Sequence, residues 1–100
     1  MLIAILDLDT ADADRPAALA QLDREHDEVR AMPGNVAFRV YASRQDPARV
    51  TVVHEWQDED AFAGYLASDA FRRSGEVLRP LLTSAPVSRR FHADLLETVR

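Results

Sequence analysis

Apolar and polar residues follow one another along this chain with spacings that predict four strands and three helices. Residues 2–6 are apolar at every position, which is typical of a central strand covered on both faces. Residues 36–43 and 87–95 alternate between apolar and polar side chains, as expected of strands, and residues 50–56 form a further, largely apolar strand. A turn at residues 44–47 joins two of these strands into a hairpin.

Apolar residues three and four positions apart predict a first helix after the acidic segment that follows residue 6. Arg15-Pro16 opens this helix, with Asp14 as its N-cap, and Pro33-Gly34 ends it. We expect its buried stripe to consist of Leu19, Leu22, His26 or Val29, and Met32. We expect its water-facing residues to be Gln21, Arg24, Glu25, Asp27, Glu28 and Arg30.

The segment around Trp56, the only tryptophan, links the third predicted strand to two further helices. Alternation places Val52, His54 and Trp56 on one face of the sheet. Asp58 is the predicted N-cap of a helix over residues 58–67, and Ser68-Asp69 begins the next helix. Aromatic residues on the inner side of these helices fold back over the indole, which indicates either a pocket wall or a corner of the core.

The order β-α-β-β-α-α-β predicts an α+β fold, namely a ferredoxin-like sandwich with a four-stranded antiparallel sheet and helices on one face. The first and third strands, which are central in that topology, carry apolar residues on both faces. The helices cover only one of these faces. We therefore expect a homodimer that packs sheet face against sheet face.

Composition limits the classes of function that need to be considered. The 100 residues predict a single domain, 1–100, and the absence of cysteine excludes disulfides and thiolate metal sites. A formal net charge of −5 disfavours nucleic-acid and anionic-membrane partners. No apolar run is long enough to span a bilayer, and we expect a cytoplasmic protein.

Several short motifs resemble functional sites but lack essential residues. Asp7-Leu8-Asp9-Thr10 resembles a phosphatase loop with its threonine one place early, and we expect the acidic residues from Asp7 to Asp14 to form a solvated connection. His54-Glu55 lacks the second histidine of a zinc motif, and three glycines are too few for a phosphate-binding loop. We therefore predict no metal site and no cofactor. His54 remains either a base near neutral pH or a structural histidine.

Three segments carry a resemblance to a known family. They are Pro33-Gly34-Asn35 with Phe38, the run from Val52 to Phe62, and Ser68-Asp69-Ala70-Phe71. Together they resemble the antibiotic biosynthesis monooxygenase (ABM) domain family. The resemblance implies a dimeric α/β barrel with a pocket between sheet and helices. Its members include cofactor-independent monooxygenases of anthrones and quinols, and haem-degrading enzymes.

The resemblance carries over to some positions and not to others. Trp56 matches the tryptophan that lines the pocket in the anthrone-oxidising branch, whereas Val52 and Phe62 stand where that branch has an asparagine and a tyrosine. In the haem-degrading branch the ligating histidine falls at Gly75 and a second tryptophan at Tyr65. The chain therefore lacks the haem ligand of that branch.

The resemblance implies, as our first hypothesis, a cofactor-independent monooxygenase that uses O2 on an electron-rich aromatic substrate such as a hydroquinone or anthrone. In this hypothesis His54 is the catalytic base, and Arg39 or Tyr41 is a candidate polar contact. The predicted substrate-binding residues are Val52, Trp56, Phe62, Tyr65 and Phe71. The alternative is a non-catalytic homodimer of the same fold that binds a small ligand or serves as an accessory domain.

Overall fold

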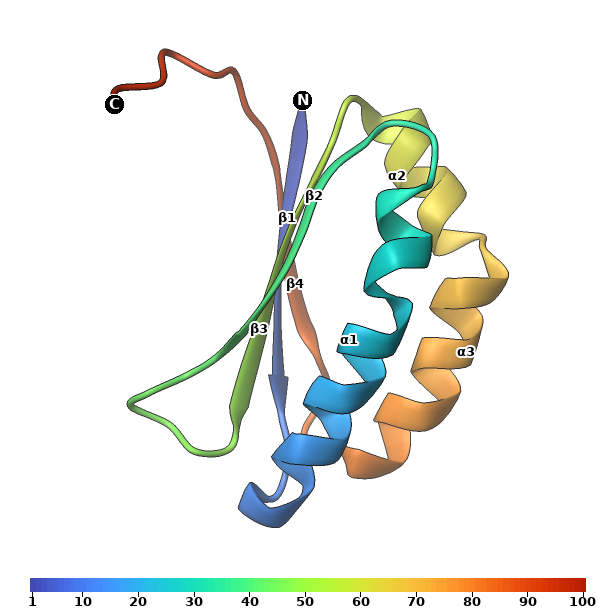
Figure 1. Ribbon diagram of the computed structural model, residues 1–100. Coiled ribbons are helices and arrows are strands. Elements are labelled where there is room, and N and C mark those ends of the chain that lie inside the picture. The colour runs from blue at the N-terminus through green and yellow to red at the C-terminus, as the bar shows by residue number, and fades with distance from the viewer.

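The computed structural model describes residues 1–100 and places three helices on one side of a four-stranded sheet (Figure 1). In chain order the elements are β1 (Leu2–Asp9), the 3-10 turn η1 (Asp12–Asp14), α1 (Arg15–Arg30), β2 (Asn35–Ala42), β3 (Arg49–Trp56), α2 (Glu59–Leu66), α3 (Asp69–Leu78), the 3-10 turn η2 (Arg79–Leu81) and β4 (Val87–His92). The predicted fold class is confirmed, with the helices covering one face only.

The sheet has the strand order β2-β3-β1-β4, and each neighbouring pair is antiparallel. The two strands with apolar residues on both faces, β1 and β3, are its central pair, with Ile5 opposite Val53. On the covered face the side chains of Val50, Val52, His54 and Trp56 are all buried. Strand alternation therefore gives the correct face for each of these four residues.

Strand β1 is longer than its apolar run predicts. Asp7 and Asp9 belong to the strand and not to a solvated connection, which corrects the sequence-based expectation. Both lie on the uncovered face opposite β3, where the hydroxyl of Thr51 donates to Asp7 (2.6 Å) and Arg49 donates two hydrogen bonds to Asp9 (2.9 and 3.0 Å). Hydrogen bonding to Arg49 lowers the pKa of Asp9. Cross-strand partners thus extend the strand through acidic residues.

Helix α1 packs on the sheet through a stripe that differs from the predicted one. Its buried residues are Ala18, Gln21, Leu22, Glu25 and Val29. His26, predicted as a stripe residue, has a side chain that is 46% exposed, and its ring meets Phe38 edge-on at the flank of the helix. The prediction that Gln21 and Glu25 face water is wrong. Their spacing from Leu22 and Val29 fits a helical stripe, and only their polarity pointed outwards.

The predicted caps and the glycine turn are confirmed with one exception. The Asp58 side chain accepts the N–H of Ala61 (2.8 Å) at the start of α2, and Ser68 accepts the N–H of Phe71 (3.2 Å) at the start of α3. Asp14 lies at the N-cap position of α1 but makes no side-chain capping bond. Gly34 follows α1 with φ of 79°, a backbone conformation that glycine adopts without a steric penalty.

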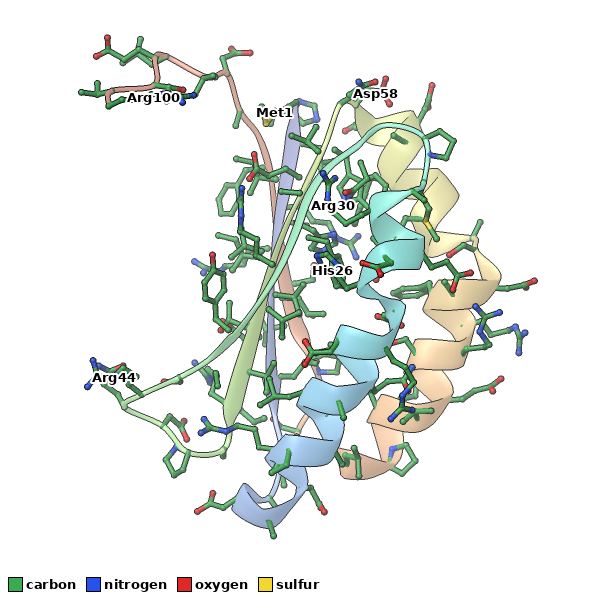
Figure 2. The ribbon with its side chains drawn as sticks, in the orientation of Figure 1. Met1, His26, Arg30, Arg44, Asp58 and Arg100 are labelled. Carbon is green, nitrogen blue, oxygen red and sulfur yellow. The ribbon has the colours of Figure 1, made fainter.

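The last strand is shorter than predicted. Strand β4 ends at His92, and the segment that follows projects away from the sheet, with Arg100 at its tip (Figures 1 and 2). The carbonyl of Ala93 accepts a hydrogen bond from the Met1 ammonium group (2.9 Å), and pairing with the sheet stops there. Leu95 and Leu96 beyond it are 70% and 94% exposed. None of the helices is both long and apolar enough to cross a membrane.

Candidate functional site

A cavity of about 150 Å³ lies between the covered face of the sheet and the helices. Strands β1, β2 and β3 form its floor, and helices α1, α2 and α3 form its sides. Its walls are mainly apolar, with four polar side chains and an arginine among them. The lining residues are Leu6, Leu8, Leu22, Glu25, Phe38, Val52, His54, Tyr65, Phe71, Ser74, Gly75, Leu78, Arg79, Leu82 and Pro86. Apolar walls with a few polar groups are typical of a small-molecule site.

A larger hollow of about 580 Å³ lies at the edge of the molecule, beside the start of α2. Its lining is mostly polar and exposed, and within it His92 meets Glu59 at 2.7 Å. Because these groups are already hydrated, a ligand would bury little apolar surface there. We therefore place the candidate site in the smaller cavity.

His54 presents a defined tautomer to the cavity. Its Nδ1 accepts the indole N–H of Trp56 at 2.9 Å, which places the imidazole proton on Nε2. Burial, and secondarily the positive charge of Arg90, lower the pKa of His54 to about 4. The ring is therefore neutral at pH 7, and Nε2–H has no partner within the protein.

An aromatic cluster holds this histidine in position. The rings of Phe38, Phe62 and Tyr65 lie 5.6–5.9 Å from the His54 ring, centre to centre. Trp56 is fully buried and stacks on Tyr65, with ring centres 5.2 Å apart. The Tyr65 hydroxyl has no hydrogen-bond partner in the protein, and burial raises the pKa of this phenol.

Glu25 projects from α1 into the lining of the cavity. The residue is only 7% exposed, and both of its carboxylate oxygens are buried without a hydrogen-bond partner. Burial raises its pKa to about 7. The polar side chains of Ser74 and Gln21 oppose this shift through long, weak contacts to the carboxylate that fall short of well-formed hydrogen bonds. A buried and unpaired carboxylate is costly and is seldom retained without a function.

The structure brings four of the predicted site residues together, since Val52, His54, Tyr65 and Phe71 all line the cavity. Trp56 and Phe62 lie behind His54 and Tyr65 and do not line it.

The expected polar contacts Arg39 and Tyr41 are wrong, because β2 directs both side chains to the uncovered face of the sheet. Arg39 forms an ion pair there with Glu55 (2.9 Å). No three His, Asp or Glu side chains gather to form a group that could hold a metal ion.

The profile of the family described as "Antibiotic biosynthesis monooxygenase" matches residues 1–76. The chain belongs to this family. The match covers strands β1 to β3, helices α1 and α2, and most of α3. It therefore includes all lining residues of the cavity except Leu78, Arg79, Leu82 and Pro86. It confirms the resemblance drawn from the Trp56 segment.

Solved structures of the ABM family superimpose closely on the chain. A Deinococcus radiodurans protein named for the family gives a TM-score of 0.90 at 15% identity, covering 100% of this chain and 99% of that one. A Nitrosomonas europaea protein gives 0.88 at 14% identity, covering 93% and 98%. A Caulobacter crescentus protein gives 0.81 at 18% identity, covering 94% and 90%. At such identities the likeness establishes the fold alone. No curated protein matches the sequence.

Sequence reasoning missed two polar residues of this ABM cavity, Glu25 and Ser74. The signal for Glu25 was its spacing, three residues after Leu22 and four before Val29, within an otherwise apolar stripe. For Ser74 no comparable signal exists, because small polar residues occur on both faces of helices.

Proposed function

We propose that this ABM-family protein is a cofactor-independent monooxygenase that acts on an electron-rich aromatic compound bearing a hydroxyl group. The observation that carries the proposal is the cavity beneath the helices. Its walls are apolar, yet His54 Nε2–H and the Tyr65 hydroxyl line it without partners in the protein. An aromatic ring fits such walls, and its oxygen substituents would satisfy the unpaired groups.

The volume of the cavity favours a small substrate. A cavity of about 150 Å³ has room for roughly one benzene ring. A hydroquinone is of this size, whereas a three-ring anthrone would require the helices to move apart. We therefore propose a single-ring hydroquinone as the substrate class.

The chemistry requires no electron carrier other than the substrate. A hydroquinone and O2 together give a hydroxyquinone and water, and each product receives one of the two oxygen atoms of O2. Loss of a hydroxyl proton makes the ring electron-rich enough to reduce O2. The protein would contribute orientation, exclusion of water and control of that proton. In this scheme Val52, Tyr65 and Phe71 contact the ring, and Trp56 and Phe62 support these contacts from behind.

Oxygen consumption tests this proposal. We expect the purified protein to consume O2 with at least one member of a panel of single-ring hydroquinones, and to form a hydroxyquinone in equal amount. His54→Asn should retain an acceptor for the Trp56 indole but lose Nε2–H, and activity should fall. No consumption above buffer with any member, or unchanged rates in His54→Asn, would contradict the proposed enzyme.

A non-catalytic ligand-binding protein is the second candidate, and two observations favour it. Val52 and Phe62 replace polar residues of the anthrone-oxidising branch. In addition, the acceptor nitrogen of His54 is occupied by Trp56, which leaves the predicted base without a free lone pair. Binding of hydroquinones without O2 consumption would identify this function.

We also propose that two copies associate through the uncovered sheet face. ABM-family proteins are typically dimeric. On this face Tyr41, Val87 and Phe91 are 49%, 56% and 45% exposed, and the apolar residues of β1 and β3 lie between them. Burying these side chains against a second copy would remove an exposed apolar surface.

A further inference from the structure

The proposed reaction requires a group that removes the hydroxyl proton, and the hydrogen bond from Trp56 restricts His54 to another role. Nδ1 already accepts the indole N–H at 2.9 Å, and Nε2 already carries a proton. To act as a base, the ring would have to break its bond to Trp56 or exchange tautomers within a packed aromatic cluster. As it stands, His54 is a hydrogen-bond donor to whatever occupies the cavity.

We infer that Glu25 is the proton acceptor of this cavity and the group that recognises the hydroxyl of the substrate. Both carboxylate oxygens are buried and unpartnered, and the residue lines the same cavity as His54 and Tyr65. The lining of the cavity therefore includes an acceptor residue on α1 together with donors on β3 and α2. The assignment of a proton-transfer role rests on the function proposed above, whereas hydroxyl recognition requires only that a ligand binds.

The charged groups around Glu25 are consistent with this role. Glu28 on the same helix raises the Glu25 pKa and Arg73 of α3 lowers it, and these two residues pair with each other at 2.8 Å. His54 is neutral at pH 7, and the Tyr65 phenol remains protonated. Burial dominates and brings the Glu25 pKa to about 7, where a general base works most effectively at neutral pH.

The proposed step moves one proton. The O–H bond of the substrate breaks, the proton passes to a carboxylate oxygen of Glu25, and the electron pair remains on the substrate oxygen. His54 Nε2–H and the Tyr65 hydroxyl then donate hydrogen bonds to that oxyanion. The negative charge moves from Glu25 to the substrate oxygen while Arg79, which also lines the cavity, keeps its positive charge, so the net charge of the cavity does not change. The oxygen atom of O2 that leaves as hydroxide later takes up the proton held by Glu25 and becomes water.

Activity measurements separate Glu25 from the other carboxylates of α1. We expect Glu25→Gln to lower kcat by roughly a hundredfold or more while changing KM less. We expect kcat of the wild type to rise through neutral pH, this rise to disappear in Glu25→Gln, and Glu25→Asp to restore part of the activity. Asp23→Asn, which removes a carboxylate from the exposed side of the same helix, should match the wild type. An active enzyme with unchanged kcat and pH profile in Glu25→Gln would overturn the inference.

A binding measurement separates this inference from the proposed function. In calorimetric titrations we expect the wild type and Asp23→Asn to bind phenol roughly tenfold more tightly than its methyl ether, anisole, because only phenol donates a hydrogen bond to a carboxylate. Glu25→Leu should lose that preference while remaining folded. If the wild type consumes no O2 yet shows the Glu25-dependent preference, the monooxygenase proposal fails and the recognition site stands. If the wild type consumes O2 and the preference for phenol survives in Glu25→Leu, the monooxygenase proposal stands and the role of Glu25 in recognition fails.

Discussion

At the scale of single residues, Glu25 and His54 line the same cavity, and burial shifts their pKa values in opposite directions. Glu25 is raised from 4.5 to about 7, and His54 is lowered from 6.5 to about 4. Folding therefore disfavours the charged form of both groups. The free energy of unfolding is not reduced by His54 above pH 6.5, and it decreases as pH falls towards 4 because the unfolded chain binds a proton there more readily. For Glu25 the direction is opposite: the free energy of unfolding is not reduced below pH 4.5, and it decreases as pH rises through 7.

Replacing Glu25 should therefore make the protein more stable in mildly alkaline solution. Between pH 4.5 and 8 we expect the wild type to lose up to about 3 kcal/mol of unfolding free energy relative to Glu25→Gln. Urea denaturation of both proteins at pH 5 and pH 8 provides the measurement. The stability of Asp23→Asn should depend on pH as that of the wild type does. If the unfolding free energy of all three proteins changes equally between pH 5 and pH 8, burial does not destabilise the ionised carboxylate of Glu25.

The same residue shows where sequence reasoning about the site reached its limit. Alternation along β3 placed Val52, His54 and Trp56 on the correct face, because strand geometry determines the side on which each residue lies. It did not reveal that the indole donates to Nδ1, since that contact depends on the rotamers of two side chains. Glu25 was assigned to water from its charge alone, and only the packing of α1 against α3 shows that it is buried.

At the scale of elements, the join between α1 and β2 depends on Gly34. The residue has a positive φ, and a Cβ at this position would lie 2.5 Å from the Cβ of Ala61 in α2. Two separate constraints therefore exclude a side chain here. In addition, the Gly34 carbonyl accepts the N–H of Gln57, which ties this turn to the end of β3.

Alanine should have opposite effects at Gly34, where both constraints act, and at Gly64, where neither does. Gly34→Ala should lower the unfolding free energy by roughly 2–4 kcal/mol, combining backbone strain with overpacking against Ala61. Gly64→Ala, in the middle of α2 with no heavy atom within 4 Å of the added Cβ, should raise it by roughly 0.5–1 kcal/mol. Thermal or chemical denaturation of the pair checks both values.

A third variant separates strain from overpacking at position 34. Combining Gly34→Ala with Ala61→Gly removes the close contact and leaves the positive φ. We expect this double variant to recover part of the loss. If Gly34→Ala proves as stable as the wild type, neither constraint operates.

Element order was predictable, and element ends were predictable only where a local signal marked them. Asp58 and Ser68 marked the starts of α2 and α3, since their side chains cap the first turn. The ends of β1 and β4 were misjudged, because strands end where their partners end. Asp9 remains in β1 through its contact with Arg49, and β4 stops at His92 although the alternating pattern continues.

At the scale of the whole molecule, the uncovered sheet face is the surface through which we propose that two copies of the chain associate. Val53 lies near its centre on β3, opposite Ile5 of β1. We expect Val53→Glu to convert the dimer proposed above to a monomer at micromolar concentration, because a carboxylate between two packed sheets would lose its hydration. Analytical ultracentrifugation of the wild type and the variant provides the measurement.

A matched variant distinguishes loss of the interface from loss of the fold. Ala63→Glu adds the same charge at an exposed position of α2, on the opposite side of the sheet, and should leave the sedimentation behaviour of the wild type unchanged. Far-UV circular dichroism should be the same for all three proteins. A wild-type protein that sediments as a monomer would remove the proposed interface.

The strand order also determines when the sheet can form during synthesis. Strand β1 is at the centre of the sheet although it is the first of the four strands to be made, and its two neighbours end at Trp56 and His92. A growing chain on the ribosome must therefore hold a bare apolar strand until β3, which ends at Trp56, has emerged. Nascent chains that stop short of β3 should be clients of chaperones, and chains that include it should not.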